Sequence, residues 1–452
     1  MINYEIFRAY DIRGVYGKDL NEELANIIGK AYCSFLGNHS TVGVGRDVRQ
    51  SSKSLTDAII SGLMDCGCNV IDFGTIPSPL VYFGVRHLNL NGGLMVTASH
   101  LPPEWNGFKF CDSNGILFSE GTGLEKIKKI IWESNFLKLE KGKYKGYKEI
   151  SQIYLNYILS NINISKKLKI VIDYGNSVTA NIVPHILKSI GMEIYNINES
   201  LDVKVPNRIS ELTDESLQDL RKKVLETNAD IGIAYDGDGD RVAFVDDKGN
   251  IYNSGNILIP IFAEHILKNN PGGKIVFDIT CSSAVYDYVK SLGGEPIVTR
   301  VGHTYVAKAV IENRALMGGQ YSGHLCFIEN NCLDDAIYAS IKMLEILSFN
   351  NMKLSELIKK IPKYPFTGIT EIRCDDSNKF SVINKVADLA KSLNFHIITI
   401  DGVKIIAESG WVLIRASNTS PIIRINAEGK TIEDAIKMQK MGENLVKEAM
   451  KL

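Results

Sequence analysis

The residues best suited to chemistry form a short acidic loop. Asp236, Asp238 and Asp240 alternate with two glycines, and Arg241 follows directly. Three carboxylates this close repel one another unless a cation lies among them, and the glycines allow the backbone to turn the alternate side chains toward one point. The loop therefore predicts a site for a hard divalent cation that prefers oxygen ligands.

An EF-hand and a plain hairpin tip fit this loop less well. An EF-hand needs glycine where Arg241 stands and glutamate where Asp247 stands, and it lies between helices, whereas the flanking runs 231–235 and 242–245 are typical of strands. A polar hairpin tip needs one aspartate and not three at alternate positions. The sequence therefore favours the cation site.

A second segment, residues 97–109, follows a predicted strand and holds Ser99, His100 and Lys109. A hydroxyl, an imidazole and an ammonium in one loop could make the serine a nucleophile or a carrier of phosphate. Taken alone, the loop could also be an ordinary turn rich in serine, threonine and asparagine. No Gly-x-Ser-x-Gly elbow surrounds Ser99, which argues against a hydrolase triad.

Two further loops carry polar groups in compact patterns. Residues 318–324 form a glycine-rich stretch whose amide, hydroxyl and imidazole groups suit sugar hydroxyls. Residues 415–421, with Arg424 close behind, offer two guanidinium groups, hydroxyls and free turn N–H groups, which together could cradle a phosphate. A surface loop and a capped hairpin turn remain the alternatives for these two segments.

The elements that must position these loops alternate between short apolar, β-branched runs and longer amphipathic stretches. This alternation predicts β-α units around mostly parallel sheets. The series starts three times, which suggests three related α/β units. The predicted strands are 41–45, 67–73, 93–97, 168–173 and 274–278, and the predicted helices are 20–36, 52–64, 180–190 and 282–292.

Composition marks the boundaries between these units. The lysine- and glycine-rich stretch 138–148 has no apolar periodicity, and the prolines in 361–365 interrupt a helix, so both are predicted to be linkers. A further boundary falls near residue 250, after the acidic loop and its second strand. The predicted domains are therefore 1–145, 146–250, 251–364 and 365–452, the last being a smaller α+β module.

Charge and cysteine usage exclude several classes of protein. The 452 residues carry 51 basic and 52 acidic side chains, so no global basic field exists to hold nucleic acid or an anionic membrane, and we expect a small-molecule partner. The first fourteen residues are too charged for a signal peptide, and no run approaches the ~18 apolar residues of a spanning helix. Eight scattered cysteines indicate neither a disulfide framework nor a zinc site. We therefore expect a cytoplasmic protein.

These loops, together with the segment Phe7–Gly14 (FRAYDIRG), occur in the order and approximate spacing of the α-D-phosphohexomutase superfamily. The chain most resembles the phosphomannomutase/phosphoglucomutase branch, because phosphoglucosamine mutases usually have a segment closer to FGTDGIRG at the N-terminal position. The resemblance spans nearly the whole sequence. It implies three α/β domains with mixed sheets and a smaller C-terminal α+β domain, arranged around a central cleft.

The resemblance also implies roles for individual residues. Ser99 would carry a phosphoryl group, and one Mg²⁺ per chain would be held by that phosphoserine with Asp236, Asp238 and Asp240. The implied catalytic residues are Ser99, Arg13, Lys109, His324 and His100. The implied substrate-binding residues are Tyr10, His303, Gln320, Ser322, Arg241, Arg415, Ser417, Asn418, Thr419 and Arg424, of which the last five would hold the phosphate that is not being transferred.

The activity implied is interconversion of hexose 6-phosphate and hexose 1-phosphate, with mannose, glucose or both as the sugar. A hexose 1,6-bisphosphate would be the intermediate and activator. A phosphoglucosamine or phosphopentose mutase of the same family remains an alternative, as does either a monomer or a homodimer. A second alternative is a haloacid-dehalogenase-like phosphotransferase that uses Asp236 as its nucleophile and Asp334 and Asp335 as metal ligands, although Asp240 stands where such enzymes have threonine or valine.

Two positions depart from the family pattern. Family members generally have glutamate where Gln320 stands, and several have lysine within the stretch that corresponds to residues 279–281. Both changes remove charge from the expected sugar site. Because an amide forms weaker hydrogen bonds than a carboxylate, we expect a looser grip on the sugar and a broader specificity.

Overall fold

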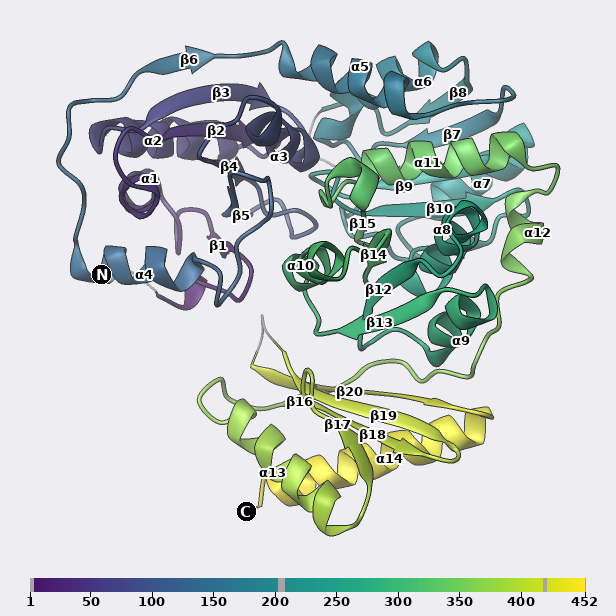
Figure 1. Cartoon of the computed structure of the whole chain (residues 1–452). Helices are drawn as coiled ribbons and strands as arrows, with labels where there is room; N and C mark the ends of the chain where they lie inside the picture. Colours follow the sequence, from purple (N-terminus) through teal and green to yellow (C-terminus); the bar gives the residue numbers. More distant parts are fainter. Residues whose placement is uncertain (1–3, 202–207, 418–420, 452) are drawn as a thin grey trace.

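The computed structural model describes residues 4–201, 208–417 and 421–451, which form four sheets that follow one another along the chain. Three sheets are mixed and flanked by helices, and the fourth is antiparallel (Figure 1). This arrangement confirms the predicted class of three α/β units and a smaller C-terminal α+β unit.

The first sheet has the strand order β1-β5-β4-β2-β3-β6. Its central strands are parallel, and β4 and β5 form an antiparallel pair whose connecting loop carries Ser99. The bounds are β1 Ile12–Val15, β2 Thr41–Arg46, β3 Asn69–Thr75, β4 Gly92–Val96, β5 Trp105–Asp112 and β6 Tyr144–Gly146, with helices α1 Glu22–Leu36, α2 Ser52–Asp65, α3 Ser78–His87 and α4 Leu124–Glu133 and the short 3₁₀ helix η1 Tyr4–Ile6.

The second sheet has the order β11-β10-β9-β7-β8, and its antiparallel β9–β10 pair carries the acidic loop at its tip. The bounds are β7 Lys169–Asp173, β8 Glu193–Ile197, β9 Ile231–Tyr235, β10 Val242–Asp246 and β11 Ile251–Tyr252, with helices α5 Ile150–Asn161, η2 Val178–Asn181, α6 Val183–Ser189 and α7 Gln218–Thr227.

The third sheet has the order β13-β12-β14-β15, and the 320–324 loop joins its antiparallel β14–β15 pair. The bounds are β12 Lys274–Asp278, β13 Glu295–Thr299, β14 Met317–Gly319 and β15 Leu325–Phe327, with helices α8 Gly255–Asn269, α9 Ser283–Ser291, α10 His303–Asn313, η3 Ile328–Asn330, α11 Ala336–Phe349 and α12 Leu354–Ile358.

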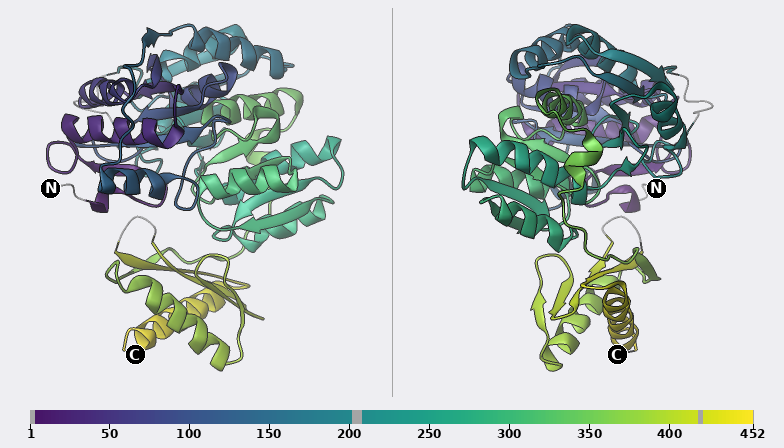
Figure 2. Two further views of the ribbon diagram at one scale, coloured as in Figure 1. Left: turned by 60° about the vertical axis from the view of Figure 1, so that its left-hand side comes forward. Right: turned by 90° about the vertical axis from the view of Figure 1, so that its right-hand side faces the viewer.

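The fourth sheet has the order β16-β20-β19-β18-β17. Two helices, α13 and α14, pack on it, and both ribbon views show this unit set apart from the other three (Figures 1 and 2). The bounds are β16 Thr370–Arg373, β17 His396–Ile398, β18 Val403–Ala407, β19 Gly410–Ala416, β20 Ile422–Gly429, α13 Lys379–Ser392 and α14 Ile432–Ala449.

The hydrophobic core accounts for this separation. One continuous buried cluster runs from Phe73 through the second and third units to Ile361, so the first three units pack as one body. Helix α11 lies where the second and third units meet, and the hydroxyls of Tyr235 and Ser340 are 2.6 Å apart at that contact. The fourth unit has its own core and meets the third unit through the small cluster of Ile279, Trp411 and Leu413 and through polar contacts such as that of the Val301 N–H with Asp401.

Two sequence predictions differ from the structure. The stretch 138–148 contains β6, which pairs with β3 at the edge of the first sheet, and its exposed side chains are the reason that no apolar pattern marks it as a strand. The helix expected over 180–190 is divided into η2 and α6, because Pro184 lies in the first turn of α6. Among the helices of the described ranges, none combines the length and the apolar character needed to cross a bilayer.

Candidate active site

The same structural position carries chemistry in each of the first three units. The loop with Ser99, the acidic loop and the 320–324 loop each connect two consecutive antiparallel strands of their sheet. Packing of the three units as one body brings these loops together, so that residues more than a hundred positions apart form hydrogen bonds. The candidate site therefore follows from one connection used three times.

The acidic loop converges as its sequence predicts. Asp236 Oδ1 accepts hydrogen bonds from the backbone N–H groups of Gly239, Asp240 and Arg241 at 3.0, 3.2 and 3.2 Å, and Gly239 adopts φ +78°, which favours glycine. This turn brings ligand oxygens of Asp236, Asp238 and Asp240 within 4.8 Å of one another. All three carboxylates are buried.

Two basic side chains already lie against these carboxylates. Lys109 Nζ, from β5, donates to Asp238 Oδ2 at 2.7 Å and to Asp240 Oδ2 at 2.5 Å. Arg241 Nε lies 3.2 Å from Asp236 Oδ2. Three carboxylates thus face two cations, and the cluster keeps a negative charge that a further cation can balance.

The charges shift the pKa values of this cluster in opposite directions. Burial, reinforced by Asp240 and Asp238, raises the pKa of Asp236 to about 6. Burial would also raise the pKa of Asp238, but the ammonium of Lys109 outweighs it and lowers that pKa. Burial would lower the pKa of Lys109, yet Asp238 and Asp240 raise it well above its ordinary value.

The donor set of this cluster fits Mg²⁺. Asp238 Oδ1 and Asp240 Oδ1 are buried and have no hydrogen-bond partner within residues 4–201, 208–417 and 421–451. A buried carboxylate oxygen without a partner is unfavourable, and a cation with oxygen ligands would satisfy both atoms. Asp236, Asp238 and Asp240 are therefore suitable ligands for a hard dication.

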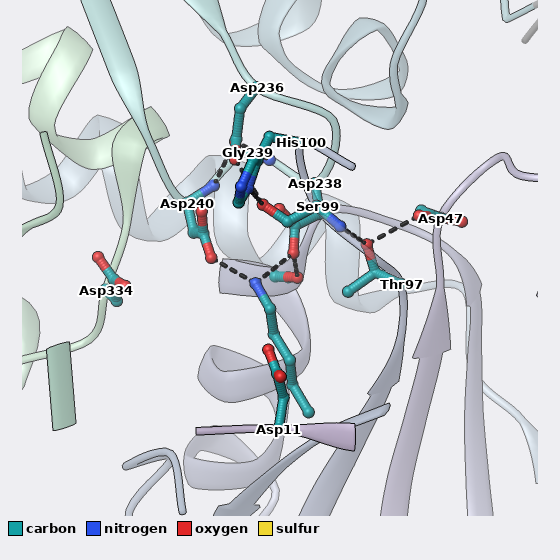
Figure 3. A network of polar contacts seen from close by, with 12 residues as sticks. Asp11, Asp47, Thr97, Ser99, His100, Asp236, Asp238, Gly239, Asp240 and Asp334 are labelled. Atoms are coloured by element: carbon teal, nitrogen blue, oxygen red, sulfur yellow. Dashed lines mark hydrogen bonds and ion pairs between the residues drawn. The ribbon is translucent and has the colours of Figure 1, made fainter. Parts of the chain in front are cut away.

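Ser99 lies directly beside this cluster (Figure 3). Its Oγ donates to Asp236 Oδ2 at 2.8 Å and lies 3.3 Å from Nδ1 of His100. The residue has φ +51°, a conformation that is uncommon for side chains other than glycine and that often marks functional sites. Burial, together with Arg241 and Arg13, holds the pKa of His100 far below its ordinary value, so this imidazole is neutral.

Two residues that sequence reasoning did not single out hold the Ser99 loop in place. Arg49 donates from its guanidinium to the carbonyl oxygens of Ser99, Leu101, Pro102 and Trp105, at 2.6 to 3.0 Å. Asp47 accepts from Thr97 Oγ1 at 2.8 Å, and Thr97 Oγ1 in turn accepts from the Ser99 N–H at 2.9 Å. No local motif marks Asp47 and Arg49, because they follow an ordinary strand and act across the sheet.

The structure also places His324 at the acidic loop. His324 forms a backbone bridge with Arg241, and its Nδ1 lies 4.0 Å from Asp240 Oδ1 and 2.6 Å from Asp334 Oδ2. Burial would lower the pKa of His324, but Asp334 and Asp240 raise it overall. Asp334 is a further residue of this region, and its sequence context suggested only the alternative role of a late metal ligand.

Three more predicted residues gather on the same side. The rings of His303 and His324 are 5.4 Å apart, and those of Tyr10 and His303 are 5.8 Å apart. Burial, and then the charge of His324, lowers the pKa of His303 well below its ordinary value. Arg13, on β1, donates from Nε to Asp11 Oδ2 at 2.5 Å. The ring contacts connect the N-terminal segment of the first unit to the third unit.

The 320–324 loop is anchored to a buried carboxylate. Gln320 Nε2 lies 3.4 Å from Asp278 Oδ2, and the Tyr321 N–H donates to the same oxygen at 3.1 Å. Burial raises the pKa of Asp278, although Thr280 and Arg415 partly oppose that effect. Ser322, at the tip of the loop, is exposed. The amide of Gln320 is therefore a donor to the protein as well as a group that faces the site.

The predicted phosphate cradle lies on the fourth unit. Arg415 and Arg424 are opposite each other on β19 and β20, where Arg415 Nη1 is 3.8 Å from Asp401 Oδ2 and Arg424 Nε is 3.1 Å from Glu371 Oε1. Ser417 is buried at the end of β19. Asn418 and Thr419 lie outside the described residues. The structure thus brings together the residues of the first three units and places the cradle on a separate one.

Comparison with known proteins identifies the family. Family profiles described as phosphoglucomutase/phosphomannomutase match in order: alpha/beta/alpha domain I at residues 4–138, domain II at 152–249, domain III at 254–364 and the C-terminal domain at 370–442. The chain belongs to this family of the α-D-phosphohexomutase superfamily. The predicted superfamily, fold class and enzyme class, an isomerase that transfers a phosphoryl group, are thereby confirmed.

Individual relatives agree with this assignment. A phosphomannomutase/phosphoglucomutase of Pseudomonas syringae pv. tomato is 37% identical over 440 residues, covering 96% of this chain and 93% of that protein. A protein of Pyrococcus horikoshii named probable phosphoglucosamine mutase is also 37% identical, with 98% of each chain covered. A crystal structure of a phosphoglucomutase/phosphomannomutase family protein from Burkholderia thailandensis superimposes with a TM-score of 0.91 at 32% identity, covering 100% of this chain and 98% of that one.

Proposed function

We propose that this phosphohexomutase interconverts hexose 6-phosphate and hexose 1-phosphate through a phosphoserine at Ser99 and a hexose 1,6-bisphosphate. The observation that carries the proposal is the position of Ser99 Oγ, held 2.8 Å from a carboxylate of the acidic loop by a backbone of positive φ. A hydroxyl built into a buried cluster of carboxylates and cations is suited to carry a phosphoryl group.

One Mg²⁺ per chain would be held by Asp236, Asp238, Asp240 and the phosphate on Ser99, and when bound it would neutralise charge on the phosphoryl group that is transferred. The side chains of the protein supply the remaining positive charge. Lys109 and Arg241 already lie within ion-pair distance of the acidic loop, and Arg13 is close enough to lower the pKa of His100.

The chemical step needs a site for one proton. A sugar hydroxyl oxygen forms a bond to the phosphorus of phosphoserine, and the bond from phosphorus to Ser99 Oγ breaks. We assign the proton of that hydroxyl to His324, whose ring lies against the acidic loop. When the other phosphate returns to Ser99, His324 gives the proton back to the oxygen that is released, so protons balance over the full cycle.

The substrate would be held at two places. Tyr10, His303, Gln320 and Ser322 would contact the sugar, while the cradle of the fourth unit would hold the phosphate that is not transferred. The members of that cradle are Arg415, Ser417, Asn418, Thr419 and Arg424. Because the cradle and the phosphoserine lie on different units, either end of the bisphosphate could be presented to Ser99 without rebuilding the metal site.

We propose mannose and glucose phosphates as the main substrates. Gln320 supports this breadth, because a neutral amide shared with Asp278 discriminates less strongly among hydroxyl patterns than a carboxylate. Glucosamine and ribose phosphates are the alternatives within the family. A side-by-side assay with the four sugar 1-phosphates tests the proposal: comparable kcat/KM for mannose and glucose supports it, and turnover of glucosamine or ribose phosphate alone overturns it.

We further propose that the protein acts on this free small molecule in the cytoplasm, as a monomer or a homodimer. The eight cysteines support a reducing compartment, since all are buried free thiols. The balanced charge supports a partner that is neither nucleic acid nor membrane.

A further inference from the structure

A second cluster of metal-ligating side chains lies next to the acidic loop. His303 begins α10, His324 precedes β15, and Asp334 precedes α11. One ligand atom from each of these three residues lies within 4.8 Å of the other two. The three side chains line a single cavity, to which Gln320 and Thr304 also contribute.

Several polar side-chain atoms of this cluster lack hydrogen bonds to the rest of the described protein. Nε2 of His303, Nδ1 of His324 and both carboxylate oxygens of Asp334 are buried without a partner in the described part of the chain. Asp334 Oδ2 is 2.6 Å from His324 Nδ1, so these two atoms form a close ion pair with each other and have no other hydrogen-bond partner among the described residues. A buried polar group without a partner costs about 1–3 kcal/mol, so the unpartnered His303 Nε2 and Asp334 Oδ1 beside this ion pair indicate a missing ligand.

The neighbouring Asp335 shows what a structural carboxylate looks like here. Its oxygens accept from Tyr154 Oη at 2.7 Å, from Asn330 Nδ2 at 3.0 Å and from the Tyr338 N–H at 2.9 Å, which caps α11. The fold therefore satisfies one of two adjacent aspartates completely and leaves Asp334, which is only 8% exposed, facing the two imidazoles.

The chemistry of the donors differs from that of the acidic loop. Two imidazole nitrogens and one carboxylate suit Zn²⁺ and similar transition-metal ions, whereas oxygen ligands alone suit Mg²⁺. Three protein ligands would also leave a coordination position open. Figure 3 shows Asp334 on the side of the acidic loop where Asp240 lies, so an ion there would be close to the Mg²⁺ ligands without sharing their site.

We propose that His303, His324 and Asp334 form a second metal site that binds Zn²⁺ or a similar transition-metal ion, and that its occupancy inhibits the enzyme. Inhibition rests on the proposed function, because the metal would take the nitrogen lone pairs that we assign to sugar binding and proton transfer. Binding itself does not depend on that assignment. The two parts can therefore fail separately.

Metal binding is tested directly with Co²⁺, whose visible absorption bands become intense when the ion has a low coordination number. The full-length protein is freed of metal with a chelator, supplied with saturating Mg²⁺ and titrated with Co²⁺, and Zn²⁺ is then added to displace the bands. We expect one equivalent of Co²⁺ to bind in the presence of Mg²⁺. Absence of any bands under these conditions would overturn the site.

Three variants locate the ion. Asp334→Asn and His303→Asn should each weaken Co²⁺ binding at least about 10-fold, the lower end of the loss caused by even an outer-shell change. Asp238→Asn, in the acidic loop, is the matched control and should keep the bands. Thermal unfolding shows whether each variant is folded. If either Asp334→Asn or His303→Asn does not fold, the other still tests the site. Bands that persist in both of them and disappear in Asp238→Asn would place the ion in the acidic loop and refute the proposal.

Activity measurements test whether metal binding at this cluster inhibits the enzyme. Zn²⁺ should inhibit the wild type even when Mg²⁺ is in large excess. If Co²⁺ and Zn²⁺ bind at the cluster but turnover is unchanged, the site stands and the roles proposed for His303 and His324 are wrong. If Zn²⁺ inhibits only when Mg²⁺ is scarce, competition at the acidic loop accounts for the inhibition and the inhibitory role of the cluster is refuted.

Discussion

Replacing Lys109 by methionine removes the cation that most closely balances the acidic loop. The ammonium lies 2.7 Å from Asp238 Oδ2 and 2.5 Å from Asp240 Oδ2, and the three side chains are 5%, 0% and 1% exposed. Methionine keeps most of the length and apolar stem of lysine, so the change mainly removes charge. Breaking a buried ion pair from one side costs about 3–5 kcal/mol, because the remaining charge is left uncompensated.

The loss of stability expected for Lys109→Met depends on pH. The folded-state pKa of Asp238 lies below the ordinary value of 3.8, so its stabilising contribution is present above that value and disappears as pH falls through the folded pKa. The pKa of Lys109 is raised above the ordinary 10.5, so its contribution is present below that value and is lost only at strongly alkaline pH. The difference in the free energy of unfolding between wild type and Lys109→Met should therefore be largest at neutral pH and should decrease in acid.

The assay is urea unfolding in chelator at neutral and acidic pH, followed by a repeat with Mg²⁺. We expect the variant to lose about 3–5 kcal/mol at neutral pH and to regain part of this loss with Mg²⁺, since binding to the folded state alone is stabilising. Lys53→Met is the matched control, because its exposed pair with Asp57 should contribute at most about 1 kcal/mol. Equal stability of Lys109→Met and wild type in chelator at neutral pH would refute this account of the cluster.

Three further predictions concern the substrate and the metal. Gln320→Glu would place a second carboxylate beside buried Asp278, so kcat/KM for the preferred sugar phosphate should fall by a factor that corresponds to about 1–3 kcal/mol. Adding Thr280→Lys should restore kcat/KM, and an increase of kcat/KM in the single variant would contradict this prediction. Arg415→Lys should raise KM with a loss of about 1–3 kcal/mol in kcat/KM, because a point charge replaces a planar fork, and an unchanged KM would remove Arg415 from the phosphate site. Chelation should abolish turnover and Mg²⁺ should restore it, whereas full activity in excess chelator would exclude a metal role.

Local patterns were enough to predict the strongest elements of the site. The alternation of aspartate and glycine predicts a turn in which three carboxylates converge, and the structure contains that turn between two buried strands. The predicted strands 41–45, 67–73 and 93–97 occur as β2, β3 and β4 with small shifts at their ends. These features depend on neighbouring residues, and the sequence contains that information directly.

Such local patterns could not predict the contacts between residues that are far apart in the sequence. The acidic loop requires a cation, but nothing near it in the sequence indicates that Lys109, 129 positions from Asp238, provides one. Arg49 fixes the Ser99 loop from 50 positions away, and Gln320 is tied to Asp278 across the third sheet. These contacts depend on how strands are ordered within a sheet and on how the units pack.

The phosphorylation site of the working enzyme distinguishes a phosphoserine mechanism from an aspartyl-phosphate mechanism. The full-length protein is incubated with glucose 1,6-bisphosphate, and its intact mass and phosphopeptides are measured before and after glucose 1-phosphate is added. We expect one phosphoryl group on Ser99, which resists hydroxylamine and is lost when the sugar monophosphate accepts it. A hydroxylamine-sensitive phosphoryl group on Asp236, with Ser99 unmodified, would exclude the phosphoserine mechanism and favour the aspartyl-phosphate alternative.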